Sequence, residues 1–310
     1  GNAQAALRRG AVNQRTRKKG RQSNMTNAIE LTHVNKRYPR FALKDISLAL
    51  PAGQIMGFLG ENGAGKTTTI KTMLGLVRRD GGKVKLLGMD LDKEAVRIKE
   101  DVGIVFDDCA FPSLLTATEV GRMMKGIYQN WDGGRFETLC RDFTLDPKKP
   151  VKDYSRGMRM KLSLAAAMSH RSRLLILDEP TSGLDPVVRE EILDIFQAFI
   201  QDETHSILFS SHITTDLDKI ADSVAFMHEG KLLFCRGKDE MLDNMGILRA
   251  SQRELAALPK DQVARVRKNA FGCEALIQNK RDFIRQHPSR PIDPAHLEDI
   301  MLFYIKGEIL

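Results

Sequence analysis

The sequence predicts an α/β fold in which a mainly parallel core sheet carries a phosphate-binding loop. Short apolar segments recur and alternate with helical stretches, a pattern typical of parallel strands covered by helices. These segments are Ile55–Leu59, Leu174–Leu177, Ile207–Ser210 and Val224–Met227. The first leads into residues 60–67, Gly-Glu-Asn-Gly-Ala-Gly-Lys-Thr, which match G-x-x-x-x-G-K-[ST] and precede a helical pattern. Both flanks are the context that a phosphate-loop NTPase requires.

Two further parts are expected within this core. Strand-like alternation at Ile29–Thr32 and Ile46–Leu50 predicts a small antiparallel β subdomain beside the nucleotide site. From about residue 107 to 160 the pattern turns helical, with predicted helices at Leu114–Tyr128 and Arg135–Phe143. We interpret this stretch as an inserted helical subdomain.

The chain changes character after Gly237. Candidate strands at Val263–Val266 and Glu274–Gln278 are followed by an amphipathic helix that is expected to start at Pro294, with Asp293 as its cap. These elements predict a small α+β appendage.

The positive charge of the chain is concentrated at its beginning. The formal net charge is +8, and residues 1–24 supply +7 of it, because they hold seven Lys or Arg and no acidic residue. Such motif-poor charge runs are usually solvated, so we expect a basic disordered tail that is a non-native, upstream extension. Binding of nucleic acid or anionic lipid by this tail is the alternative. The main domain is then expected over residues 26–237 and an accessory domain over 238–310.

The phosphate loop implies a nucleoside triphosphate with Mg²⁺. Backbone N–H groups of such a loop converge on phosphate oxygens, Lys66 reaches the outer phosphates, and the Thr67 hydroxyl ligates Mg²⁺. Asp178 ends an apolar strand, where a carboxylate holds Mg²⁺, and Glu179 faces elsewhere and can polarise the attacking water. A solvated acidic pair is the alternative. The candidate nucleotide-binding residues of the loop are Gly60, Asn62, Gly63, Ala64, Gly65, Lys66, Thr67 and Thr68.

From about Ile29 to Cys235, the chain resembles the ATP-binding subunits of ATP-binding cassette (ABC) transporters. The resemblance rests on motif order. After the phosphate loop come Tyr-Ser-Arg-Gly-Met at 154–158, the strand that ends in Asp-Glu, Ser-Gly-Leu-Asp at 182–185, and Ser-Ser-His at 210–212. This ordered combination is far more specific than any one motif. Overall, the chain resembles the bacterial cassettes of bacitracin, lantibiotic and related drug or lipid exporters.

The resemblance implies a role for each matched residue. Tyr38 would stack on the adenine ring, although a lone strand tyrosine is more often a packing residue. Ser155 and Gly157 would contact the γ-phosphate of ATP bound to the opposite protomer, and His212 would contact the γ-phosphate and fix the attacking water. Asp185 would help to join the two composite sites, and it also suits a helix cap before Pro186. The implied catalytic residues are Lys66, Glu179 and His212.

Two departures from the family pattern stand out. The common signature is Leu-Ser-Gly-Gly-Gln, and here Tyr154, Arg156 and Met158 replace three of its residues. Arg156 either adds a cation near the partner's phosphates or faces solvent, and we favour solvent. Asp107 stands where the family usually has Gln; it either ligates Mg²⁺ or merely solvates its loop.

The leading hypothesis is an ATPase subunit that dimerises around ATP and drives a separately encoded transmembrane permease from the cytoplasmic face of the membrane. Export of a peptide, drug or lipid is favoured over import, and the dimer is either homo- or heteromeric. The alternative is an ATP-dependent clamp on nucleic acid or the ribosome, but the single cassette and the lack of coiled coils argue against it, so no nucleic acid is expected. A third interpretation, a binding module without turnover, conflicts with the presence of both Glu179 and His212.

Overall fold

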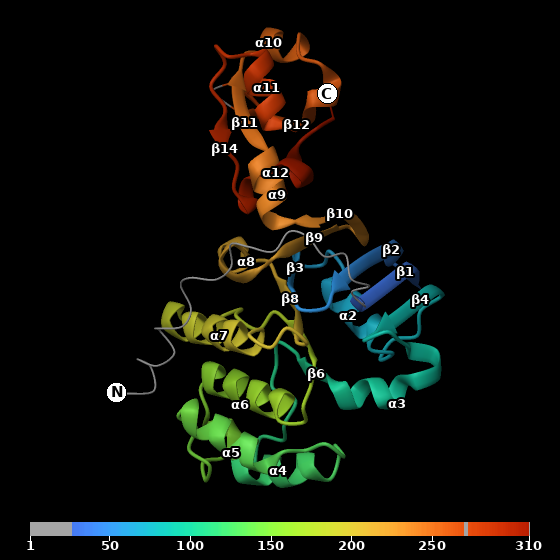
Figure 1. Ribbon diagram of the computed structural model, residues 1–310, viewed down its shortest axis with the longest axis vertical. Helices are drawn as coiled ribbons and strands as arrows, with labels where there is room; N and C mark the ends of the chain where they lie inside the picture. The colour runs from blue at the N-terminus through green and yellow to red at the C-terminus, as the bar shows by residue number, and fades with distance from the viewer. Residues whose placement is uncertain (1–26, 270–271, 310) are drawn as a thin grey trace.

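The computed structural model describes residues 27–269 and 272–309, and the predicted basic tail lies outside them. Its centre is a six-stranded sheet in the order β10-β9-β3-β8-β7-β6 (Figure 1). The strands are β3 (Ile55–Gly60), β6 (Val102–Val105), β7 (Leu174–Asp178), β8 (Ser206–Ser211), β9 (Ser223–His228) and β10 (Lys231–Gly237). All neighbours pair in parallel except β9 and β10. The predicted α/β class with a mainly parallel sheet is therefore confirmed.

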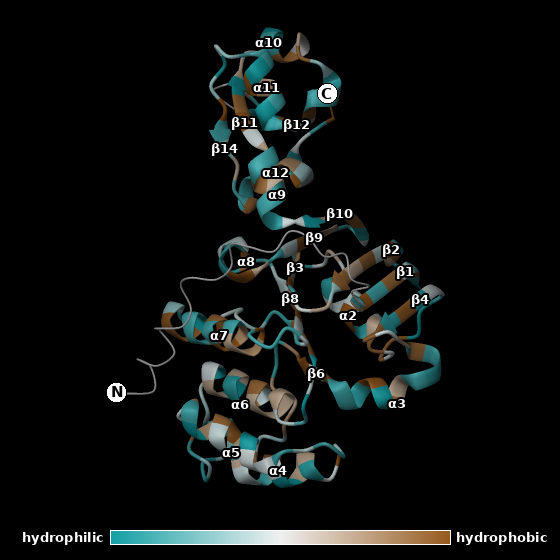
Figure 2. Cartoon of the chain, in the orientation of Figure 1, coloured by the Kyte–Doolittle hydropathy of each residue, from teal (hydrophilic) through white to brown (hydrophobic). Residues whose placement is uncertain are grey.

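Helices cover both faces of this sheet, which explains why its inner strands are buried and mostly apolar. On one face α7 (Pro186–Phe199) and α8 (Thr214–Ile220) pack through residues such as Phe196, whose ring lies 5.5 Å from that of Phe209. On the other face lie α2 (Lys66–Met73) and α3 (Leu91–Asp101). Figure 2 shows the contrast between the apolar inner strands and the largely hydrophilic α3. Every residue of β3 and β8 is buried. The phosphate loop starts at the last residue of β3, and the Ser-Ser-His segment at 210–212 starts in the last two residues of β8.

A second, antiparallel sheet lies beside α2 in the order β2-β1-β4-β5. Its strands are β1 (Asn27–Tyr38), β2 (Phe41–Pro51), β4 (Gly81–Leu86) and β5 (Met89–Asp90). In β2 the side chains of Ile46, Leu48 and Leu50 are buried, whereas the intervening Ser47 and Ala49 are exposed. This alternation buries one face of the sheet against α2 and the core.

The inserted helical part has its own small core. It contains α4 (Ala117–Lys125), α5 (Gly133–Asp142), η1 (Val151–Asp153) and α6 (Arg156–Met168). The predicted helix at 114–128 is shorter at both ends, because Thr116 and Glu119 form a capping box that starts α4 at Ala117. At its other end Gly126 caps the helix.

The C-terminal part is a four-stranded antiparallel sheet in the order β12-β13-β11-β14, with helices around it. Its elements are α9 (Lys238–Asn244), β11 (Gly246–Ala250), α10 (Gln252–Ala256), η2 (Lys260–Gln262), β12 (Val263–Asn269), β13 (Gly272–Ile277), α11 (Lys280–Gln286), β14 (Asp293–Pro294) and α12 (Leu297–Lys306). The predicted start of the last helix at Pro294 is wrong. Asp293 and Pro294 pair with β11 instead, and His296 caps α12.

The C-terminal part packs directly on the core through α12. The Tyr304 ring lies 5.1 Å from that of Phe234 in β10 and 6.3 Å from that of Phe226 in β9. In the long view of Figure 1 this part and the α4–α6 part lie at opposite ends of the molecule, with the core between them. Over residues 27–269 and 272–309, no helix is both long and apolar enough to cross a bilayer.

Candidate nucleotide site

The phosphate loop joins the end of β3 to the start of α2 at Lys66. Gly65 has a φ of +109°, and a Cβ there would lie only 2.8 Å from the Phe41 ring, so neither conformation nor space admits a side chain. The Lys66 side chain is 5% exposed, and its Nζ donates to the carbonyl oxygens of Gly60 at 2.6 Å and Glu61 at 3.2 Å. The loop therefore bends back around a buried ammonium group at the N-terminus of a helix, a position that favours anions.

The carboxylate of Asp178, at the end of β7, is fixed by two hydroxyl groups. It is 3% exposed, and it accepts hydrogen bonds from Thr67 Oγ1 at 2.7 Å and Ser210 Oγ at 2.6 Å. Thr67 and Asp178 thus place a hydroxyl and a carboxylate oxygen side by side at the first turn of α2. Hard oxygen donors of this kind are what Mg²⁺ prefers, so these residues fit the metal that the sequence implies.

Glu179 follows in a strained backbone conformation, with a φ of +52°. Its N–H donates to Ser210 Oγ at 3.0 Å. Its Oε1 lies 3.0 Å from Lys66 Nζ, and its Oε2 lies 2.7 Å from His212 Nδ1. The three residues predicted to be catalytic therefore form one connected group, in which a lysine and a histidine hold the two oxygens of a single carboxylate.

The remaining predicted nucleotide-binding residues differ in how far they are exposed. Ala64 is buried, Thr68 is half-buried, and Asn62 is exposed. Tyr38 ends β1 with 42% of its surface exposed, and Lys36 Nζ lies 5.5 Å from the centre of its ring. The tyrosine is therefore not a core packing residue, and its ring is accessible to a ligand.

Ser155, Gly157 and Asp185 lie at the N-termini of two neighbouring helices, α6 and α7. Ser155 Oγ accepts from Met158 N at 3.2 Å, and Asp185 Oδ1 accepts from Val187 N and Val188 N, each at 3.1 Å. A Cβ on Gly157 would lie 2.7 Å from Val188 Cγ1, so the two helices meet there. Within the described residues, no hydrogen bond or ion pair joins these three residues to the Lys66, Glu179 and His212 group.

Asp107 and Arg156, the two charged departures from the family pattern, contact each other. Arg156 Nη2 donates to Asp107 Oδ1 at 2.5 Å, with the two side chains 44% and 53% exposed. Arg156 is exposed, as we favoured, and it also pairs with Asp107, a contact that the sequence analysis did not predict. The pairing escaped sequence reasoning because the two residues are far apart along the chain. The only signal in the sequence was that Asp107 and Arg156 carry opposite charges and that each replaces an uncharged residue of the family pattern.

Tyr154, a third departure, is a structural residue. Its side chain is 2% exposed, and its hydroxyl donates to the Asp146 carbonyl oxygen at 2.6 Å. Burial raises the pKa of Tyr154 to about 12, so the hydroxyl stays a neutral donor at physiological pH. This hydrogen bond anchors the chain directly before Ser155.

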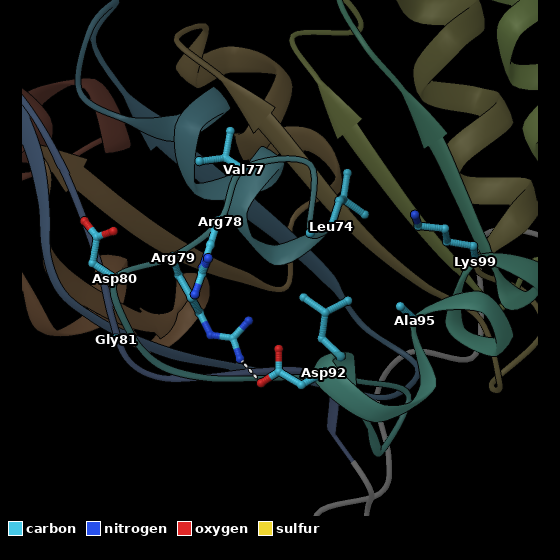
Figure 3. A pocket seen from close by; sticks show the side chains of 11 residues that line it. Leu74, Val77, Arg78, Arg79, Asp80, Gly81, Asp92, Ala95 and Lys99 are labelled. Atoms are coloured by element: carbon cyan, nitrogen blue, oxygen red, sulfur yellow. Dashed lines mark hydrogen bonds and ion pairs between the residues drawn. The ribbon is translucent and has the colours of Figure 1, made fainter.

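A separate hollow of about 480 Å³ lies between the end of α2 and α3. Arg79 points across it to form an ion pair with Asp92 (Figure 3). None of the residues that line this hollow belongs to the nucleotide-site residues described above. This hollow is therefore separate from the nucleotide site.

Comparison with known proteins places these motifs in one family. A family model described as "ABC transporter" matches residues 43–182. An uncharacterized ABC transporter ATP-binding protein of Bacillus subtilis, YhcH, is 33% identical over 225 residues, which are 71% of this chain and 73% of the relative. The bacitracin transport ATP-binding protein BcrA of Bacillus licheniformis is 34% identical over 215 residues, covering 67% and 69% of the two chains.

The fold is also that of solved ATP-binding cassettes. One such structure is described as a dimeric post-hydrolysis state of the cassette MJ0796 bound to ADP and Pi. It matches with a TM-score of 0.61 at 19% identity, covering 67% of this chain and 98% of that one. At this identity the match supports the fold alone.

Proposed function

The chain belongs to the ATP-binding proteins of ABC transporters, a family of ATPases, and we propose that it dimerises around two ATP molecules to drive a separate membrane permease. The observation that carries the proposal is the group formed by Lys66, Glu179 and His212. A buried cation, a carboxylate and an imidazole meet at the end of a phosphate loop, and each has a distinct task in phosphoryl transfer.

These residues act by positioning and by charge. Lys66 would exchange its contact with Glu179 for the outer phosphate oxygens of ATP. This exchange frees Glu179 Oε1, which lies 3.0 Å from Nζ, to accept a proton of the attacking water. His212, 2.7 Å from the other oxygen of Glu179, would hold the carboxylate and touch the γ-phosphate. Thr67 and Asp178 would hold Mg²⁺, which when bound neutralises phosphate charge.

The second half of each site would come from the partner protomer. Ser155 and Gly157 have no contact with the catalytic group of their own chain among the described residues. They occupy a helix N-terminus, which suits a phosphate presented by another molecule. Pairing of two cassettes with ATP between them would satisfy both halves, and Asp185 would link the two sites.

The substrate side is proposed from the relatives. The name of the Bacillus licheniformis relative assigns it to bacitracin transport, so we place this chain among exporters of peptides, drugs or lipids. Its permease would be a separate chain, since the relatives are named as ATP-binding proteins of transporters. The ATPase would then work at the cytoplasmic face, and the loop around Asp107 with the helical part would pass movement to the permease.

The test compares purified wild type with Glu179→Gln. Wild type is expected to hydrolyse ATP only with Mg²⁺. Glu179→Gln is expected to lose at least about 100-fold in kcat and to form a dimer in ATP but not in ADP, measured as mass by light scattering. Nucleotide binding without turnover in wild type, and no dimer in the variant, would contradict the proposal and favour a simple binding module.

A further inference from the structure

The guanidinium group of Arg156 connects three segments of the cassette. It donates to Asp107 in the loop after β6 at 2.5 Å. It also lies against the turn after β7, where a Cβ on Gly183 would be 2.9 Å from Arg156 Nη1 and 3.1 Å from its Cζ. Gly183 has a φ of +66°, so glycine suits this position both in conformation and in space. Arg156 therefore stands between the loop of Asp107 and the turn that leads to Asp185.

The position of Arg156 in α6 is electrostatically unfavourable for a cation. It is the first residue of the helix, and the first turn contains no acidic residue. The positive end of the helix dipole repels a cation there, and Arg159 adds a second positive charge within one turn. Asp107 supplies the only carboxylate that contacts Arg156 among the described residues. The N-terminus of α6 thus carries two arginines, of which Arg156 pairs with Asp107, and Asp108 lines the same hollow.

The Asp107 carboxylate is held weakly enough to be replaced. Both side chains are about half exposed, and exposed ion pairs of this kind contribute little net stability. A phosphate carries more negative charge and matches the planar fork of arginine with two parallel hydrogen bonds. The γ-phosphate of a partner-bound ATP, which the proposed function places at Ser155, would lie within side-chain reach of the next residue.

From this geometry we propose that ATP-driven pairing exchanges the partner of Arg156. In the separate protomer, Asp107 neutralises Arg156. In the ATP-held dimer, Arg156 releases Asp107 and binds the γ-phosphate on the opposite protomer. Asp107 thereby competes with ATP for the same cation and weakens the dimer, while Arg156 strengthens it. The inference rests on the proposed ATP-held dimer and assigns to it a specific phosphate-binding residue and a built-in competitor.

The exchange predicts effects of opposite sign for the two members of one ion pair. In the Glu179→Gln background, Arg156→Gln should weaken the ATP-held dimer about 10-fold in Kd, measured by sedimentation velocity. Arg156→Lys keeps the charge without the fork and should weaken it by about 3-fold. Asp107→Asn should tighten the dimer about 3-fold. No variant should form a dimer in ADP.

Asp108→Asn is the matched control, because it removes the same charge one residue away. Asp108 accepts from the Cys109 N–H at 2.9 Å and lines the same hollow without pairing with Arg156, so its variant should change the Kd much less than Asp107→Asn. If the ion pair between Asp107 and Arg156 only stabilised the cassette, Asp107→Asn and Arg156→Gln would weaken the dimer alike. That result would overturn the inference, as would an unchanged Kd for Arg156→Gln. If Glu179→Gln alone forms no dimer in ATP, the proposed function itself fails.

Discussion

The two halves of the candidate site differ in how their side chains are held. Within one protomer Glu179 contacts Lys66 at 3.0 Å and His212 at 2.7 Å, and the lysine is buried. Among the described residues, the hydrogen bonds of the Ser155 and Asp185 side chains are to backbone N–H groups of their own helices. In the first half the side chains are therefore connected within one protomer, whereas the second consists of two capped helix ends with no described hydrogen bond to that group. Different mutations should therefore weaken ATP binding to the protomer and assembly of the ATP-held dimer separately.

The largest effect is expected for the loop lysine. Lys66→Ala removes a charged donor from the buried position that we propose faces the phosphates, so ATP affinity should fall at least about 100-fold, as loss of a charge-assisted contact worth about 3 kcal/mol would produce. Isothermal titration calorimetry on the protomer measures this. An unchanged affinity would mean that the catalytic group does not lie at the phosphates.

Ser155→Asp is expected to separate the two halves. Aspartate caps a helix as well as serine does, so α6 should keep its stability. Its negative charge would repel a partner's phosphate, so the ATP-held dimer of the Glu179→Gln background should weaken about 10-fold while the ATP affinity of the protomer stays the same. A fall in protomer affinity would place Ser155 in the nucleotide site of its own chain.

Substitutions of Asp185 should lower the stability of the protein according to how much of the helix-capping contact they remove. Asp185→Ala leaves Val187 N and Val188 N without their acceptor, and the free energy of unfolding should fall by about 1.5 kcal/mol. Asp185→Asn keeps an acceptor oxygen and should cost much less. Urea denaturation of both variants distinguishes them. Equal losses would show that charge, not capping, holds the start of α7.

The C-terminal sheet provides a reference region outside both halves. Arg267 lies 2.7 Å from Glu274, and Arg249 lies 2.5 Å from Asp293, so a row of alternating charges crosses the strands. Hydrogen bonding from Arg267 lowers the pKa of Glu274 from its ordinary 4.5. Because the folded pKa is depressed, the stabilisation is present above about pH 4.5 and is lost as the pH falls through the folded pKa.

Glu274→Gln should therefore lower the free energy of unfolding by about 1 kcal/mol at pH 7, since the pair is only partly shielded from solvent. The difference from wild type should shrink as the pH falls below 4.5. Thermal unfolding between pH 3.5 and 7 measures this. A gap that does not change with pH would assign the loss to packing rather than to the carboxylate charge.

The core and its motifs could be predicted from the sequence because the signals are local. The apolar run before Gly60 predicts β3, and the loop, Asp178 and His212 each follow a strand of the same sheet. Parallel strands bring such ends together at one edge, so motif order alone predicts that these residues are neighbours. What it could not predict is that Lys66 and His212 hold opposite oxygens of Glu179.

Features that depend on pairing between distant segments could not be predicted. The last helix was expected at Pro294, but strand pairing of Asp293 and Pro294 with β11 overrides the local capping signal. The contact between Asp107 and Arg156 joins residues 49 positions apart. Considered alone, each charged residue suggests only a solvated side chain. Such contacts follow from tertiary packing, which periodicity and turn residues do not report.

The most direct test of the composite site is to mix two inactive variants. Lys66→Ala lacks a working phosphate loop but keeps its signature residues, and Ser155→Asp lacks a working signature but keeps its loop. If each site takes its loop from one protomer and its signature from the other, a mixed dimer regains one intact site, and an equal mixture should recover roughly a quarter of wild-type ATP hydrolysis, assuming free exchange and independent sites. No recovery above the sum of the separate variants, with wild type active and protomers shown to exchange, would contradict the account.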